Sequence, residues 1–179
     1  MVYILLANGC EEVEALTPYD MLLRAGVEVK TVSMNPEPTV VGAHGITFSA
    51  DTTMDEITDV PEMLVLPGGM PGTNNLDNDA RTHKMIRDTQ ESGGYLAAIC
   101  AAPMILGYSG FLVGKTVTFY PGFEKFMIGA TRDESKKVIT DGKVITARGM
   151  GAAVEFGAAL IAALKGDEAA AKVMKSIRA

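Results

Sequence analysis

Tryptophan is absent from the 179-residue sequence, which also has only two cysteines and two histidines. Cys10 and Cys100 are too few for a disulfide framework, and with two distant histidines they form no metal-ligand pattern. We therefore expect no metal site. Both thiols are expected to stay reduced, as is usual for a cytoplasmic protein.

The sequence also lacks long apolar runs and any excess of positive charge. No run approaches the about 20 apolar residues that a membrane-spanning helix needs. Met1–Ala7 lacks the basic region of a signal peptide and runs into the turn Asn8-Gly9, so it predicts a first strand. The net charge of −6 provides no electrostatic surface for nucleic acid or an anionic membrane, so we expect neither as a partner. The length and the hydrophobic content of 47% fit one globular domain over residues 1–179.

Apolar runs and turn residues predict alternating strands and helices. Strands are predicted at Val2–Ala7, Val27–Met34, Glu62–Leu66, Tyr95–Ile99 and Thr116–Phe119, with hairpins at Thr39–Phe48 and Val138–Ala147. Helices are predicted at Glu11–Arg24 with a kink at Pro18, at Asp77–Glu91, from Pro103 to about Gly107, at Ala152–Leu164 and at Asp167–Arg178. The β-α-β opening requires a right-handed crossover and a parallel sheet, so the fold class is α/β.

Cys100 lies at a sharp strand-to-helix turn. The apolar strand Tyr95–Ile99 runs straight into it, and Pro103 suits the first turn of a following helix. A thiol at a helix N-terminus tends to have a lowered pKa and to be reactive. The alternative is that Cys100 is a small buried apolar residue, as most free cysteines are.

Four loops should meet at one edge of such a sheet, because the carboxyl ends of parallel strands form the ligand-binding edge of open α/β folds. They are Asn8–Glu14, Gly68–Gly72, Cys100-Ala101 and Arg148–Gly151. Together they bring a thiol, carboxylates, glycine backbone and a guanidinium to one place. Gly149-x-Gly151 follows the last strand and lacks a third glycine, so it does not indicate a dinucleotide site.

Two features of this edge also have simpler explanations. The acidic residues Glu11, Glu12 and Glu14 stand in the first turn of a helix, where they complement the helix dipole. His44 is expected at the tip of a hairpin, where a lone histidine is more often a solvated surface residue than a ligand.

The combined motifs closely resemble those of the ThiJ/PfpI superfamily, nearest to the branch of the parkinsonism-associated deglycase and its bacterial homologues. The motifs are Gly9-Cys-Glu-Glu-Val-Glu14, Leu66-Pro67-Gly68-Gly69, Ala98-Ile99-Cys100-Ala101-Ala102-Pro103 and Arg148-Gly149-x-Gly151. They occur in the order of that family and cover nearly the whole chain. The resemblance implies a flavodoxin-like three-layer sandwich and a homodimer.

The same resemblance implies roles for individual residues. Cys100 corresponds to the family's nucleophilic, oxidation-sensitive cysteine, and Glu14 to the carboxyl group that hydrogen-bonds the thiol. Gly69 and Ala101 correspond to backbone N–H donors for an oxyanion. Arg24 and Arg148 stand where the branch also has arginines, and we expect only a supporting role for them. Cys10 is expected to be incidental.

Two departures from the family pattern affect the expected activity. Ala101 replaces the histidine of the protease-like branch, which argues against a Cys-His peptidase. Tyr120 stands where the deglycase-like branch often has a histidine, so proton transfer would depend on Glu14, on His44 of the partner subunit, or on water. The resemblance implies a cofactor-independent enzyme acting on a small aldehyde or dicarbonyl, of the glyoxalase or deglycase type. The alternative is an oxidation-sensing or chaperone-like stress protein that uses the same cysteine.

Overall fold

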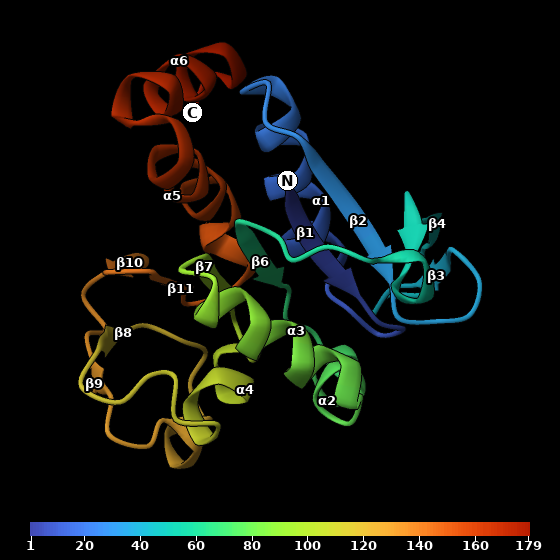
Figure 1. The fold of residues 1–179 in the computed structure, drawn as a ribbon. Helices are drawn as coiled ribbons and strands as arrows, with labels where there is room; N and C mark the ends of the chain where they lie inside the picture. Colours follow the sequence, from blue (N-terminus) through green and yellow to red (C-terminus); the bar gives the residue numbers. More distant parts are fainter.

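A mostly parallel sheet runs through the centre of the protein, whose residues 1–179 are described by a computed structural model (Figure 1). Its seven strands are, in order across the sheet, β10 (Val138–Asp141), β11 (Val144–Ala147), β7 (Tyr95–Ile99), β6 (Met63–Leu66), β1 (Val2–Leu6), β2 (Val29–Ser33) and β5 (Thr52–Thr53). All neighbouring strands are parallel except the β10–β11 hairpin. The predicted α/β fold class is confirmed.

Successive side chains of the central strands point to opposite faces of the sheet and supply two hydrophobic cores. In β1, Val2, Ile4 and Leu6 belong to one core, while Tyr3 and Leu5 belong to the other. All five side chains are buried, because helices cover both faces. A strand buried on both faces must be apolar throughout, which explains why the parallel strands appear in the sequence as short continuous apolar runs.

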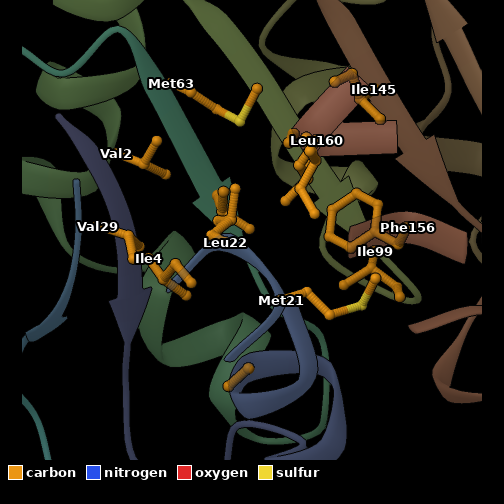
Figure 2. Close-up of a cluster of buried hydrophobic side chains, with 14 of the residues drawn as sticks. Val2, Ile4, Met21, Leu22, Val29, Met63, Ile99, Ile145, Phe156 and Leu160 are labelled. Carbon is orange, nitrogen blue, oxygen red and sulfur yellow. The ribbon is translucent and has the colours of Figure 1, made fainter. Parts of the chain in front are cut away.

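The helices divide between the two faces. On one face lie α1 (Glu12–Arg24) and α5 (Ala153–Lys165), with α6 (Asp167–Ile177) packed on α5. The other face is covered by α2 (Gly72–Asp77), α3 (Ala80–Glu91) and α4 (Pro103–Tyr108). Figure 2 shows Met21 and Leu22 of α1 together with Phe156 and Leu160 of α5 against the sheet. Burying a side chain such as Leu22 stabilises the fold by about 1.5–3 kcal/mol.

Two small sheets lie outside the central one. The predicted hairpin is formed by β3 (Thr39–Val41) and β4 (Thr47–Ser49), which are antiparallel. The strand predicted at Thr116–Phe119 is shorter, because β8 (Thr116–Val117) ends after two residues and pairs with β9 (Thr131–Arg132) instead of the central sheet. Short 3-10 turns complete the chain: η1 (Met54–Glu56), η2 (Glu124–Phe126) and η3 (Met150–Ala152).

The helix predicted at Asp77–Glu91 is found as α3 and begins three residues later, at Ala80, after the separate short helix α2. α2 ends at Asp77, and Asp79 caps a new helix by accepting a hydrogen bond from the backbone N–H of Arg81. The prediction missed α2 because Gly72–Asp77 is short and carries little apolar periodicity. Pro18 does not end α1, although it removes the N–H that would otherwise donate to the carbonyl of Glu14.

None of the helices is both long and apolar enough to cross a membrane.

Candidate active site

Cys100 occupies a strained turn between β7 and α4. Its φ of 64° lies in the left-handed region, which costs a non-glycine residue of the order of 1–3 kcal/mol. Two backbone hydrogen bonds hold this conformation: Cys100 N–H donates to the Ala147 carbonyl, and Tyr120 N–H donates to the Cys100 carbonyl, both at 2.9 Å. The turn raises the thiol above the carboxyl edge of the sheet, in the manner of a nucleophile elbow.

Glu14 lies beside this thiol in a buried position. It stands in the first turn of α1 and is only 1% exposed. Its Oε2 accepts a hydrogen bond from the backbone N–H of Gly68 at 2.9 Å, and its carboxyl group is hydrogen-bonded to the Cys100 side chain. The simpler explanation of Glu14 as a solvated partner of the helix dipole therefore does not apply, because the carboxyl group points into the protein.

The backbone N–H groups of Gly69 and Ala101 point at the sulfur of Cys100. In this position they stabilise negative charge on the sulfur. Their expected role as donors to an oxyanion stays a prediction. The Gly69 conformation has a φ of +86°, and a Cβ at this position would lie 2.3 Å from the backbone nitrogen of Glu11. The loop after β6 therefore requires glycine here for both conformation and close approach.

The thiol and the carboxyl group affect each other's ionisation. Burial, followed by the charge of Glu14, raises the pKa of Cys100 to about 12, although the N–H groups of Ala101 and Gly69 act in the opposite direction. Burial raises the pKa of Glu14 to about 7. The lowered thiol pKa expected from the helix N-terminus is thus not found, because desolvation and the neighbouring carboxylate outweigh it.

Above about pH 7, where Glu14 has lost its own proton, the thiol and the carboxyl group share the one proton that remains. Either Glu14 is ionised and accepts from the thiol, or Glu14 is protonated and donates to a thiolate. The second form places its single negative charge on the sulfur, where the Gly69 and Ala101 N–H groups also point. The arrangement can therefore produce a thiolate by proton transfer within the site.

Gly68 leaves no space for a side chain beside this pair. A Cβ at Gly68 would lie 2.6 Å from Glu14 Oε2, 2.7 Å from Cys100 Cβ and 2.9 Å from the Ile99 carbonyl oxygen. The close contact of the loop after β6 with Glu14 and Cys100 thus depends on this glycine.

Replacing Gly68 by alanine is expected to lower the free energy of unfolding by about 1–3 kcal/mol, because the methyl group overfills a packed site. Gly151→Ala is the matched control, since nothing lies within 4 Å of a Cβ at Gly151. Urea unfolding of both variants measures the difference. Equal stability of the two would contradict this packing.

A pocket of about 470 Å³ lies near Cys100, which is not itself a lining residue. A Cβ on Gly149, which lines the pocket, would lie 3.9 Å from the Cys100 sulfur and 3.3 Å from the Tyr120 ring. The pocket is lined by Thr118, Phe119, Tyr120, Pro121, Arg132, Glu134, Arg148, Gly149, Met150 and Gly151. Sequence reasoning missed Arg132 and Glu134, because they come from β9 and the residues after it, with no local motif to mark them.

Arg24 lies away from the thiol. It is at the far end of α1 from Glu14, about 15 Å along the helix axis, and its Nε donates to Asp20 Oδ2 at 2.6 Å. The expected supporting role of Arg24 at the site is therefore not supported within this chain. Cys10 is buried, and burial raises the pKa of its thiol to about 12.

His44 is held by Glu12 and not by the thiol. The His44 backbone N–H donates to Glu12 Oε1, and its Nδ1 lies 2.9 Å from Glu12 Oε2. Burial opposes ionisation of Glu12, but the hydrogen bonds from His44 and the helix backbone outweigh it and lower the pKa of Glu12. The same contacts raise the pKa of His44.

Glu11, Glu12 and His44 form one group whose ligand atoms lie within 4.8 Å of one another, close enough to hold a cation. Acidic groups of this kind are common without an ion, so the expectation of no metal site stays a prediction. Sequence reasoning missed the group because His44 is distant in the chain and reaches Glu12 only through the folding of the β3–β4 hairpin. Both Glu12 oxygens already contact His44, and this hydrogen-bonding accounts for the cluster without an ion.

A buried carboxyl group paired with a cysteine on a strand-to-helix turn of a flavodoxin-like sheet defines a class of cysteine-centred α/β proteins. The sequence matches the DJ-1/PfpI family over residues 1–163, and the chain belongs to this family.

Relatives from several organisms resemble the whole chain. Protein DJ-1 homolog B of Arabidopsis thaliana is 41% identical over 175 residues, which are 96% of this chain and 40% of that protein. Protein dj-1beta of Drosophila melanogaster is 33% identical, covering 97% of this chain and 94% of the relative. Glutathione-independent glyoxalase DJR-1.2 of Caenorhabditis elegans is 27% identical, covering 97% and 93%. The chain spans less than half the length of the Arabidopsis DJ-1 homologs A and B.

Solved structures have the same fold. Drosophila melanogaster DJ-1beta has a TM-score of 0.93 at 32% identity, with 98% of this chain and 96% of that chain covered. Oxidized Toxoplasma gondii DJ-1 also has a TM-score of 0.93, at 31% identity and the same coverage.

Proposed function

We propose that the chain is a cofactor-independent enzyme that converts reactive α-oxoaldehydes, such as methylglyoxal, into α-hydroxy acids. The observation that carries the proposal is the thiol–carboxyl pair, in which Cys100 meets a buried Glu14 whose pKa lies near 7. A general acid–base group works best when its pKa is close to the operating pH. The name of the glyoxalase relative from Caenorhabditis elegans supports the same chemistry.

The first step forms a hemithioacetal. The Cys100 thiolate attacks the aldehyde carbon, and the aldehyde oxygen takes the proton that Glu14 held. The carboxylate of Glu14 then removes the proton from the former aldehyde carbon and returns it to the neighbouring ketone carbon. The hydroxyl proton of the hemithioacetal passes to the ketone oxygen in the same rearrangement. The product of this transfer is a thioester of the hydroxy acid. Water breaks the carbon–sulfur bond, releases the acid and restores the thiol.

Measuring methylglyoxal loss and lactate formation in a buffer without amines or added thiols tests the proposal. Stoichiometric lactate supports it. Methylglyoxal loss without lactate would indicate only trapping by the thiol, and would contradict turnover.

Oxidation sensing is the second candidate function, favoured by the same hydrogen bonds at the sulfur. A sulfinate at Cys100 could accept hydrogen bonds from protonated Glu14 and from the Gly69 and Ala101 N–H groups. The solved Toxoplasma gondii DJ-1 is an oxidized form, which is consistent with such a role.

Mild peroxide is expected to add two oxygen atoms to Cys100 and none to Cys10, because Cys10 is fully buried while Cys100 is partly accessible. Mass spectrometry of the tryptic peptides measures both sites. Equal oxidation of the two cysteines would contradict a tuned site.

Peptidase activity is the least supported alternative, because neither histidine is bonded to Cys100. His44 contacts Glu12, and His83 contacts Asp77.

We also infer a homodimer. Large apolar side chains stay exposed in two places: Val13 and Leu16 on α1, and Tyr120 and Met150 in the lining of the pocket. Gathered apolar groups on a surface are typical of interfaces. Light scattering tests the inference against the chain mass of 18.9 kDa.

A further inference from the structure

Arg148 carries a positive charge that no direct ion pair or side-chain hydrogen bond compensates. Its exposed side chain makes no hydrogen bond or ion pair, although its backbone N–H donates to the Lys137 carbonyl at 3.0 Å. Glu155 is the acidic group that attracts it, but the Glu155 carboxylate is already paired with Lys137. Two cations therefore share one carboxylate on this side of the pocket.

Arg132, the other cation of the pocket lining, is paired with carboxylates. Arg132 forms ion pairs with Glu134, which also lines the pocket, and with Glu124, both at 2.6 Å. Its guanidinium also stacks on the Phe119 ring, 4.5 Å from the centroid. These contacts hold the Arg132 side chain in the wall of the pocket. Arg148 is then the cation of the pocket lining that has no ion-pair partner.

Arg148 is the chain neighbour of a residue that lies close to the reacting sulfur. It directly precedes Gly149, whose Cβ position lies 3.9 Å from the Cys100 sulfur, and adjacent Cα atoms are about 3.8 Å apart. Gly149 thus connects the sulfur to the pocket, and a small substrate attached to Cys100 would lie beside a pocket whose unpaired charge is the Arg148 guanidinium. Guanidinium groups bind carboxylates well because their paired N–H groups match the two carboxylate oxygens.

We propose that the pocket beside Cys100 selects α-oxoaldehydes that end in a carboxylate, and that Arg148 is the residue that binds this carboxylate. The reaction at Cys100 rests on the proposed function, whereas the binding of the anion rests on the charges of the pocket alone. A fitting substrate is γ,δ-dioxovalerate, whose carboxylate follows the dicarbonyl group after two carbons. Addition of water would convert it into α-hydroxyglutarate: the aldehyde carbon is oxidised to a carboxylate and the ketone is reduced to a hydroxyl, so no external oxidant is needed.

The first test compares kcat/KM for γ,δ-dioxovalerate with that for its uncharged methyl ester. The wild-type chain should prefer the acid by about tenfold or more, the effect of one charged hydrogen-bonded pair. Arg148→Gln should bring the ratio close to one. Arg87→Gln is the matched control, because Arg87 is an exposed, unpaired arginine on α3, outside the pocket. A wild type without preference, or an equal loss in both variants, would overturn the proposal.

The second test does not depend on turnover, so it separates failure of this inference from failure of the proposed function. Iodoacetate and iodoacetamide both alkylate a thiolate with loss of iodide, but only iodoacetate is an anion. The measured quantity is the rate of alkylation by iodoacetate divided by the rate with iodoacetamide, for Cys100 in a Cys10→Ser background. This ratio should be higher at Cys100 than for free glutathione. It should fall about tenfold in Arg148→Gln. A ratio that Arg148→Gln leaves unchanged would overturn the inference even if methylglyoxal is turned over. If the ratio falls about tenfold in Arg148→Gln but the wild type does not turn over methylglyoxal, only the proposed reaction is rejected.

Discussion

Replacing Cys100 by serine is expected to lower methylglyoxal turnover more than about a thousandfold, as the loss of a nucleophile does in other covalent enzymes. A serine hydroxyl fits the turn, but Glu14 cannot ionise it as it does a thiol, because an alkoxide is far more basic. The strained φ of Cys100 and its two backbone hydrogen bonds should persist, so the variant should fold.

Cys10→Ser is the matched control for this substitution. Cys10 is buried in the β1–α1 loop, its pKa is raised by burial, and it takes no part in the proposed reaction. Lactate formation should stay near the wild-type rate in this variant. If Cys10→Ser lost activity and Cys100→Ser kept it, Cys10 and not Cys100 would be the nucleophile.

Replacing Glu14 by glutamine is expected to lower kcat by about a hundredfold to ten-thousandfold, the usual contribution of a general acid–base group. Glutamine can still accept the hydrogen bond from Gly68, but its amide cannot carry the shared proton. The wild-type rate should change around pH 7, because that is where the Glu14 carboxyl group titrates. The pH dependence at this point should be absent in Glu14→Gln. Glu91→Gln, at the exposed end of α3, serves as the control.

The same substitution should stabilise the fold at alkaline pH. The folded-state pKa of Glu14 is raised from the ordinary 4.5 to about 7, so the folded protein binds this proton more tightly than the unfolded chain. The contribution of Glu14 to the wild-type free energy of unfolding is fully present below pH 4.5. It is lost as the pH rises through 7, which lowers the free energy of unfolding by up to about 3 kcal/mol. Glutamine does not ionise, so the Glu14→Gln variant does not lose this stability as the pH rises. The difference in unfolding free energy should therefore move in favour of Glu14→Gln between these pH values, and a constant difference would contradict the burial of a titrating carboxyl group.

The alternation of strands and helices was determined by the sequence, because local periodicity reports which faces are buried. The apolar runs at Val2–Ala7 and Tyr95–Ile99 predicted parallel strands, and the structure has them as β1 and β7. The same local signals predicted the turn at Cys100 and the β10–β11 hairpin. Motif resemblance added the pairing of Glu14 with Cys100, which spacing alone could not have provided.

Tertiary structure alone decided the properties that depend on desolvation and on distant partners. The sequence favoured a lowered thiol pKa from the helix N-terminus, but packing buried the thiol beside a carboxylate and reversed the direction. Folding brought His44 to Glu12 and placed the Arg132 side chain in the wall of the pocket. It also separated Arg24 from the site along α1. A residue's neighbours in sequence determine its local conformation, whereas its charge state and partners depend on groups that only the folded chain brings together.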